Sequence, residues 1–231
     1  MECMTQHPKG DGSRSRASGW RPLAVGGAAL IILTACAAPL ASVQYPSSAP
    51  LTQPSWPAPP DPMALVQEAG LVAETAEYLT THNHAHLDVF VDGVPITVPG
   101  AIGIDTKSSG VTDTVTPDGT AHDFQVAICP AVCLSPLHTH DPSGIIHSES
   151  QAANHPAYLL GEFFTEWGVR LDASCVGDFC APDALIHVYL NGTLYSGDPS
   201  QIPLASLLEI AIVIGQPPTL IPSEWQFMTP S

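Results

Sequence analysis

The sequence predicts an α+β domain that is mainly β, with antiparallel hairpins in a sandwich-like arrangement and one or two short helices. Two stretches, at 87–98 and 185–195, alternate apolar with other residues around a tight-turn pair. A stretch between them has its apolar residues at helical spacing instead. These observations set the fold class but leave the strand topology open.

The N-terminus has the order of residues expected of a lipoprotein signal. Basic residues precede an apolar run from Leu23 to Ala35, which ends at the lipobox-like string Leu33-Thr34-Ala35-Cys36. The run is shorter than the roughly 20 residues that a membrane-spanning helix needs. We therefore expect residues 1–35 to be a signal peptide and Cys36 to be lipidated, with the protein anchored on the outer face of a membrane. The alternative is an ordinary signal peptide cut at a nearby small residue, with Cys36 removed or incidental.

Residues 36–60 are predicted to form a tether. From 37 to 60 the chain is rich in Pro, Ser and Ala and has no charged residue, which is typical of an extended, partly polyproline II segment. The remainder, 61–231, is long enough for a single domain with its own core, and a second full domain is not expected. Asp61-Pro62 then indicates an N-cap followed by proline at the first helical position, opening a short helix that Gly70 can end.

Each predicted hairpin has a turn signal at its centre, Asp92-Gly93 in the first and Asn191-Gly192 in the second. The two hairpins can be aligned at these turns, so they are candidates for a degenerate internal repeat, although such short units also resemble one another by chance. Between them, Leu160, Phe163, Phe164 and Trp167 share one face of a predicted helix that Gly168 ends. From Leu207 to Ile214 the chain is continuously apolar and rich in Ile, as in a buried strand.

The charge balance is strongly acidic, with 22 acidic and 6 basic residues and a formal net charge of −16. After residue 35 the basic residues are Lys107 and Arg170. Nucleic acid is not expected as a partner, because binding phosphates needs clustered Lys and Arg. An acidic chain instead favours solubility and attracts cations.

Four cysteines follow the leader: Cys129, Cys133, Cys175 and Cys180. In an exported protein an even set is expected to form disulfides. We predict the two local pairs, 129 with 133 and 175 with 180, because short loops close most readily. A thiolate metal site is the alternative, although the C-x3-C and C-x4-C spacings differ from the usual C-x2-C.

The histidines carry the most functional information. His82, His84 and His86 occupy every second position before the first predicted strand, and residues two apart on an extended chain point to the same side. The same spacing recurs at His138 with His140 and at His147 with Glu149. Neutral imidazole is a good ligand for zinc, copper, iron or nickel. The predicted ligands of a transition metal ion, copper or zinc, are His82, His84, His86, His138, His140, His147 and Glu149.

Asp141 has two interpretations, since it could orient the ring of a ligand by accepting its other N–H or simply form a turn with Pro142-Ser143-Gly144. His122, His155 and His187 stand outside the motifs and are expected to be ordinary surface or core residues. Without a metal, the cluster would be a pH-responsive group of histidines or a hydrogen-bonded polar seam.

Three strings together resemble a family of uncharacterised exported bacterial proteins. They are HxHxHL at 82–87, CLxxLHTHDxxGIIHxES at 133–150 and LGxFFxxWG at 160–168. The likeness extends from about Leu79 to Phe227, and the middle string is the most specific. It implies no established activity. The family pattern has a single cysteine before the LHTH string, so the additional Cys129 makes a local disulfide plausible and puts a ligand role for Cys133 in doubt.

Three functions fit these observations. The first is an extracytoplasmic, lipid-anchored protein that sequesters, senses or delivers copper or zinc. The second is a metal-dependent enzyme, a hydrolase or oxidoreductase, in which histidines hold the ion and Glu149 is the general base; no H-E-x-x-H string supports it. The third is a cell-surface interaction domain without metal.

Overall fold

The computed structural model describes residues 50–78, 80–115, 119, 121–152 and 156–227. The predicted signal peptide, Cys36 and residues 37–49 of the predicted tether lie outside this part of the chain. The elements in chain order are α1 (Pro62–Glu68), β1 (Thr81–Val91), β2 (Val94–Ile96), β3 (Val111–Val115), β4 (His122–Val126), β5 (Leu137–His138), β6 (Ile145–Ser150), α2 (Leu160–Trp167), β7 (Cys175–Val176), β8 (Phe179–Cys180), β9 (Ile186–Leu190), β10 (Thr193–Tyr195), the 3-10 helix η1 (Pro199–Gln201) and β11 (Leu208–Ile214). No helix among the described residues has the length and apolar character needed to cross a membrane. The α+β, mainly β prediction is confirmed.

Both predicted hairpins form, β1 with β2 and β9 with β10. Their turns have positive φ at both central residues, 49° and 77° at Asp92-Gly93 and 48° and 74° at Asn191-Gly192. This backbone matches the right-handed twist of the strands, and Asn, Asp and Gly adopt it at least cost. The turn side chains also bind the neighbouring chain: Asn191 Oδ1 accepts from Glu209 N (3.0 Å) and Asp92 Oδ1 from Gln216 N (2.9 Å).

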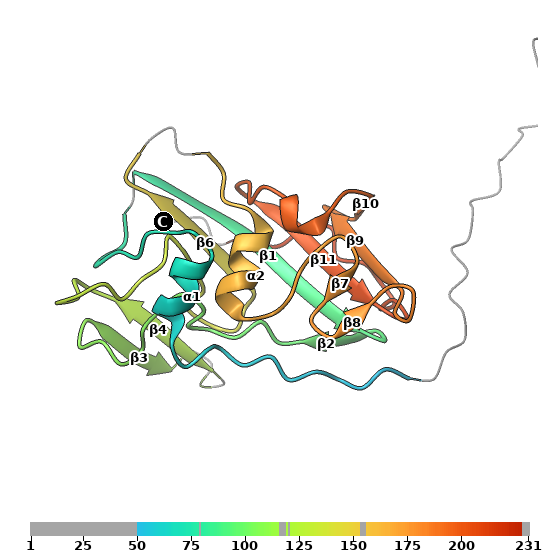
Figure 1. Ribbon diagram of the computed structural model, residues 1–231, viewed down its shortest axis with the longest axis horizontal. Coiled ribbons are helices and arrows are strands. Elements are labelled where there is room, and N and C mark those ends of the chain that lie inside the picture. The colour runs from blue at the N-terminus through green and yellow to red at the C-terminus, as the bar shows by residue number, and fades with distance from the viewer. Residues whose placement is uncertain (1–49, 79, 116–118, 120, 153–155, 228–231) are drawn as a thin grey trace, which may run out of the picture. The chain divides into compact units, whose positions relative to one another are not determined.

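The two hairpins are joined in one seven-stranded sheet with the order β10-β9-β11-β1-β6-β5, to which β2 adds beside β1. Figure 1 shows β1 running through the middle of this sheet. The pairing of β1 with β11 is parallel, whereas the others in the sheet are antiparallel. The hairpin patterns did not predict this pairing, because turn chemistry specifies only strands that are neighbours in sequence. Burial explains it: six of the seven residues of β11 are buried, as suits a central parallel strand.

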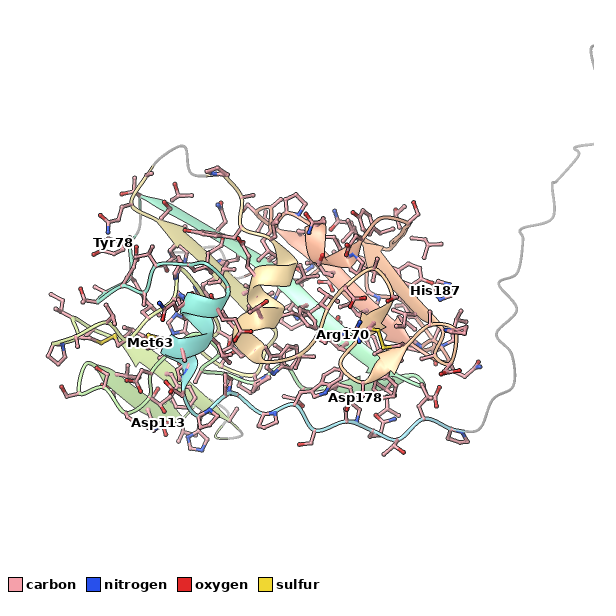
Figure 2. The ribbon with its side chains drawn as sticks, in the orientation of Figure 1. Met63, Tyr78, Asp113, Arg170, Asp178 and His187 are labelled. Carbon is pink, nitrogen blue, oxygen red and sulfur yellow. A yellow bond between two sulfur atoms is a disulfide. The ribbon has the colours of Figure 1, made fainter. Side chains whose placement is uncertain are left out.

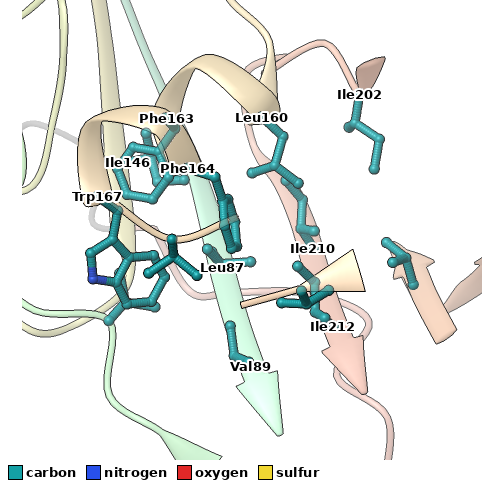
Figure 3. Packing of buried hydrophobic residues seen from close by; sticks show 14 of the residues in the cluster. Leu87, Val89, Ile146, Leu160, Phe163, Phe164, Trp167, Ile202, Ile210 and Ile212 are labelled. Atoms are coloured by element: carbon teal, nitrogen blue, oxygen red, sulfur yellow. The ribbon is translucent and has the colours of Figure 1, made fainter. Parts of the chain in front are cut away.

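Helix α2 covers one face of the sheet and forms the core with it (Figure 3). Leu160, Phe163, Phe164 and Trp167 are all buried, as their spacing predicted. They pack over apolar residues of β1, β6 and β11, among them Leu87, Val89, Ile146, Ile210 and Ile212. Gly168 ends the helix in the left-handed conformation with φ of 72°, the predicted stop. The two-layer packing is thus helix on sheet.

One carboxyl group is buried beneath α2. Glu166 is fully buried, and its Oε1 accepts a hydrogen bond from Ser135 Oγ (2.6 Å). Burial raises the pKa of Glu166 well above its usual value, which favours the protonated form. The contact ties the helix to the loop that leads into β5, which matters because Ser135 also holds a histidine of the site described below.

The end of the predicted tether packs on the domain, so the expected boundary at residue 61 needs correction. Trp56 lies edge-on to Trp167 with ring centroids 5.8 Å apart, and its carbonyl accepts from Trp167 Nε1 (3.0 Å). Gln53 Nε2 donates to the carbonyl of Val91 (3.0 Å), and Leu51 packs against the core. The Pro-rich backbone keeps its carbonyls available, and its two large apolar side chains find partners. Residues 50–60 therefore belong to the domain.

Helix α1 forms at its predicted place, with Pro62 in its first turn and the left-handed Gly70 (φ 79°) two residues beyond its end. Asp61 makes no side-chain capping bond. The two local disulfides, Cys129–Cys133 and Cys175–Cys180, are present as predicted. They exclude the alternative thiolate metal site, because a sulfur in a disulfide is not a thiolate. The first disulfide closes a small second core beside β3 and β4.

Candidate metal centre

The face of the sheet opposite α2 carries the histidines, because side chains alternate along each strand. Ala85, Leu87 and Val89 of β1 point into the core. The even-numbered residues of β1 therefore face the other way. In the register of the three strands, His84 lies opposite His147 on β6, and His147 lies opposite His138 on β5. Three chain segments thus contribute one imidazole each to a single row across the sheet.

His82, His84 and His147 form what we call the outer triad, since His82 is exposed and the other two are half-buried. His82 Nε2 lies 2.9 Å from His84 Nε2 and 3.1 Å from His147 Nδ1. The rings of His84 and His147 are 4.4 Å apart at their centroids. Three ring nitrogens from two strands therefore converge within the reach of one ion.

His138, His140 and Glu77 form what we call the inner group. His138 is fully buried at the end of β5, and the His140 side chain is 15% exposed. His138 Nε2 lies 3.2 Å from His140 Nε2, which in turn lies 3.2 Å from Glu77 Oε1. A ring nitrogen of His147 lies within 4.8 Å of those of these two histidines, so His147 adjoins both sets.

Backbone carbonyls fix the tautomers of the two inner histidines. His138 Nδ1 lies 2.9 Å from the carbonyl of Ser135, and His140 Nδ1 lies 2.6 Å from that of Phe124. A carbonyl oxygen only accepts, so each Nδ1 carries the hydrogen. In the neutral rings each Nε2 then carries a free lone pair and no hydrogen, and the two Nε2 atoms face each other. Two lone pairs at this distance repel unless a cation or a proton lies between them.

The observed spacing suits a metal ion. Two ligands at the usual Zn–N distance of about 2.0–2.1 Å in tetrahedral geometry are roughly 3.3 Å apart. The 3.2 Å between the Nε2 atoms of His138 and His140 is close to this value. Hydrogen bonds from ring N–H groups to carbonyls are also the usual means by which proteins orient histidine ligands.

Glu149 lies between the two sets of ligands. Its side chain is 1% exposed, and its Oε2 accepts from the backbone N–H of Tyr78 (2.8 Å). Its Oε1 has no hydrogen-bond partner in the described part of the chain. This oxygen lies 3.5 Å from His82 Nε2 and 3.9 Å from His138 Nε2. A buried carboxylate oxygen without a partner is costly, and a bound cation would satisfy it.

Burial controls the protonation of the cluster. It lowers the pKa of His138 and of His147, and the charges of neighbouring imidazoles lower both further. Burial raises the pKa of Glu149 to about 7. Burial alone would lower the pKa of His140 too, but hydrogen bonds with Glu77 and with the carbonyl of Phe124 outweigh it and raise that pKa. Neutral imidazole, the form that binds metal, therefore prevails at His138 and His147.

Residues 99–102 hold the segment after β5, which positions His140. Thr139 is buried, and its hydroxyl donates to the carbonyl of Pro99 (2.8 Å) and accepts from Ile102 N (3.1 Å). Gly100 approaches so closely that a Cβ there would lie 2.8 Å from the carbonyl oxygen of His140. Larger residues at 100 would push this strand end away from the sheet.

His86 does not join the other histidines, contrary to the predicted ligand set. It is buried, with Nδ1 2.9 Å from Glu209 Oε2 and with Nε2–H donating to the carbonyl of Ser143 (2.8 Å). Trp225 stacks on its ring at 3.7 Å. Residues two apart on a strand are roughly 6.6 Å apart. Three alternating histidines thus span too far for one ion. His86 lies opposite Ile145 of β6, which offers no ligand, and opposite Glu209 of β11.

Of the two interpretations of Asp141, the structure shows the turn. Its Oδ1 accepts from Ser143 N (2.9 Å), while the carbonyl of Phe124 orients His140 in its place. The sequence reasoning missed Glu77 and Glu209. The sequence around Glu77 has no metal-ligand spacing, and only the folded chain brings this residue to the site. Glu209 could have been noticed as the charged residue inside an otherwise apolar strand.

The remaining histidines are as expected where the structure describes them. His122 is on β4, with a 67% exposed side chain paired to Asp113 (2.8 Å). His187 lies on β9, at the opposite end of the view from Tyr78 (Figure 2), whose backbone N–H donates to Glu149. His155 lies outside the described residues.

Comparison with known proteins finds no relative of this chain. No family model, curated protein or solved structure matches the chain. The resemblance to exported bacterial proteins therefore stays a prediction, and functional inference depends on the geometry described above.

Proposed function

We propose that this protein binds a transition metal ion, copper or zinc, through its histidine cluster. The observation that carries the proposal is the pair of Nε2 atoms of His138 and His140. In the neutral rings both Nε2 atoms carry lone pairs, and they lie 3.2 Å apart. His138 is fully buried and the His140 side chain is 15% exposed. Three further imidazoles and two carboxylates surround them.

The types of ligand limit which metal ions fit the site. The site is rich in imidazole and offers no thiolate, since the four cysteines of the domain are in disulfides. Imidazole with a carboxylate suits Zn²⁺ and Cu²⁺ better than the hard ions Ca²⁺ and Mg²⁺. The 1% exposure of Glu149 favours a ligand or charge-balancing role for it over that of a general base acting on substrate. Binding and handling of the ion is thus better supported than hydrolysis.

A proton is the competing occupant. A protonated His140 would donate to His138 or Glu77, as in a pH-responsive cluster without metal, and the raised pKa of His140 is consistent with this. The two candidates differ in one respect that can be measured, the metal content of the folded protein.

The test uses the full chain, purified without an affinity tag, and elemental analysis after dialysis. We expect stoichiometric zinc or copper in the unmodified protein and a loss of half of that metal or more in the His138→Ala/His140→Ala variant. His122→Ala is the matched control, since it removes an exposed histidine outside the cluster and should leave the metal content unchanged. Equal metal in the double variant and the control, or no uptake of Zn²⁺ or Cu²⁺ by the unmodified chain, would refute the proposal.

We also propose that the chain is a lipoprotein on the outer face of a membrane, anchored at Cys36. The basic and apolar leader with its lipobox supports this, and disulfides are typical of exported proteins. Fatty acid labelling should therefore mark the native chain and bring it into the membrane fraction, whereas Cys36→Ala should be unlabelled. Equal labelling of the two would disprove the anchor.

A further inference from the structure

The cluster has more ligands than one ion uses. The outer triad, the inner group and Glu149 supply five imidazoles and two carboxylates. Zinc sites in proteins are mostly four-coordinate, and copper sites have similarly few ligands. Either several of these side chains are bystanders or there is a second ion.

Their spacing argues for the second ion. Two ligands of one ion are at most about 4.2 Å apart, twice the metal–nitrogen distance. Among the described residues, the ligand atoms that lie within 4.8 Å of one another fall into overlapping groups of three instead of one group of five histidines. The two histidine groups have His147 in common. Two neighbouring centres, with His147 a ligand of the outer one, fit this pattern without rearrangement of the strands.

Glu149 has the position of a bridging ligand. The oxygen that has no hydrogen-bond partner, Oε1, faces one imidazole of each set, His82 at 3.5 Å and His138 at 3.9 Å. Its other oxygen is held by the backbone, so the carboxylate cannot turn away. In two-metal centres the ions are about 3.5–4 Å apart, a distance that one carboxylate or one shared oxygen spans.

We infer that the cluster holds two transition metal ions, an outer one on the outer triad and an inner one on the inner group, with Glu149 between them. The inference rests on the proposed metal-binding function. The two positions differ in depth: His82 is exposed, whereas His138 is fully buried. The outer ion therefore exchanges with solvent and is the one delivered or acquired, while the inner ion exchanges slowly and ties β5 and the segment after it to Glu77.

The experiment compares half-site variants of the full chain. Zn²⁺ is bound to saturation, its stoichiometry is measured by elemental analysis, and its release to a chelator is followed in time. We expect two Zn²⁺ per native chain, released in a fast and a slow phase. His84→Ala should keep one Zn²⁺ and lose the fast phase, and His140→Ala should keep one and lose the slow phase. Because each variant retains one ion, retention itself shows that the variant is folded.

A second variant and a second metal complete the test. If His140→Ala does not fold, Glu77→Gln, at a partly exposed side chain, should accelerate the slow phase at least tenfold and leave the fast phase unchanged. With Cu²⁺, two bridged ions couple magnetically, so the native chain should show less paramagnetic resonance intensity than its copper content. Each half-site variant should show the full intensity of one isolated ion.

The outcomes separate this inference from the proposed function. One Zn²⁺ per native chain, lost in both His84→Ala and His140→Ala, would overturn the two-ion centre but keep a metal-binding protein. Failure of the native chain to bind Zn²⁺ or Cu²⁺ would overturn both. Two ions released in a single phase would refute the assignment of fast exchange to the outer ion and slow exchange to the inner ion.

Discussion

Replacing His147 with alanine is expected to weaken metal binding more than any other single change in the cluster. His147 belongs to both histidine groups, so its loss takes a ring nitrogen from the site whichever group holds the ion. Loss of a residue that only orients a ligand costs about 10–100-fold in affinity. We therefore expect Kd for Zn²⁺ to rise by more than about 100-fold in His147→Ala, measured by competition with a chromophoric chelator.

This variant should remain folded, which makes the result interpretable. His147 is only half-buried on β6, and its removal relieves the crowding of five imidazoles. The free energy of unfolding of the metal-free variant should lie within about 1 kcal/mol of the metal-free native chain. In the presence of ion at about 100 times Kd, the native chain should gain about 2.7 kcal/mol per site, and the variant should not. Unchanged affinity in folded His147→Ala would contradict the shared role of this residue.

Replacing Trp167 with alanine is expected to have the largest effect on stability. Trp167 is buried at the end of α2, packs on Phe164 at 5.4 Å between ring centroids, and binds the carbonyl of Trp56. Truncating a buried Trp typically costs about 3–5 kcal/mol. We expect a loss of this size in the free energy of unfolding, measured with denaturant on the disulfide-intact protein.

The comparison variant is Trp167→Phe, which keeps an aromatic ring but cannot donate to Trp56. It should lose the hydrogen bond, about 1 kcal/mol, and part of the packing. Residues 50–60 should become more accessible to proteases in both variants, because Trp56 lies against Trp167. A loss below about 1 kcal/mol in Trp167→Ala would show that α2 is not essential to the core.

Local chemistry explains which parts of the fold could be predicted. The turns at Asp92-Gly93 and Asn191-Gly192, the stop at Gly168 and the two disulfides depend on residues close in sequence, and all are present. The parallel pairing of β1 with β11 and the packing of Trp56 join segments far apart in the chain. No turn signal or periodicity encodes such contacts, since they depend on how the whole core closes.

For the metal centre, the sequence determined which residues can bind and which side of a strand they occupy, because alternation along a strand is a local property. It could not determine which alternating residues meet. The register of β1 with β6 brought His84 to His147, whereas the pairing with β11 placed His86 beside Glu209. Glu77 joined through the fold alone. Strand order and register decide which side chains lie next to an imidazole across a sheet, and only the assembled sheet fixes them.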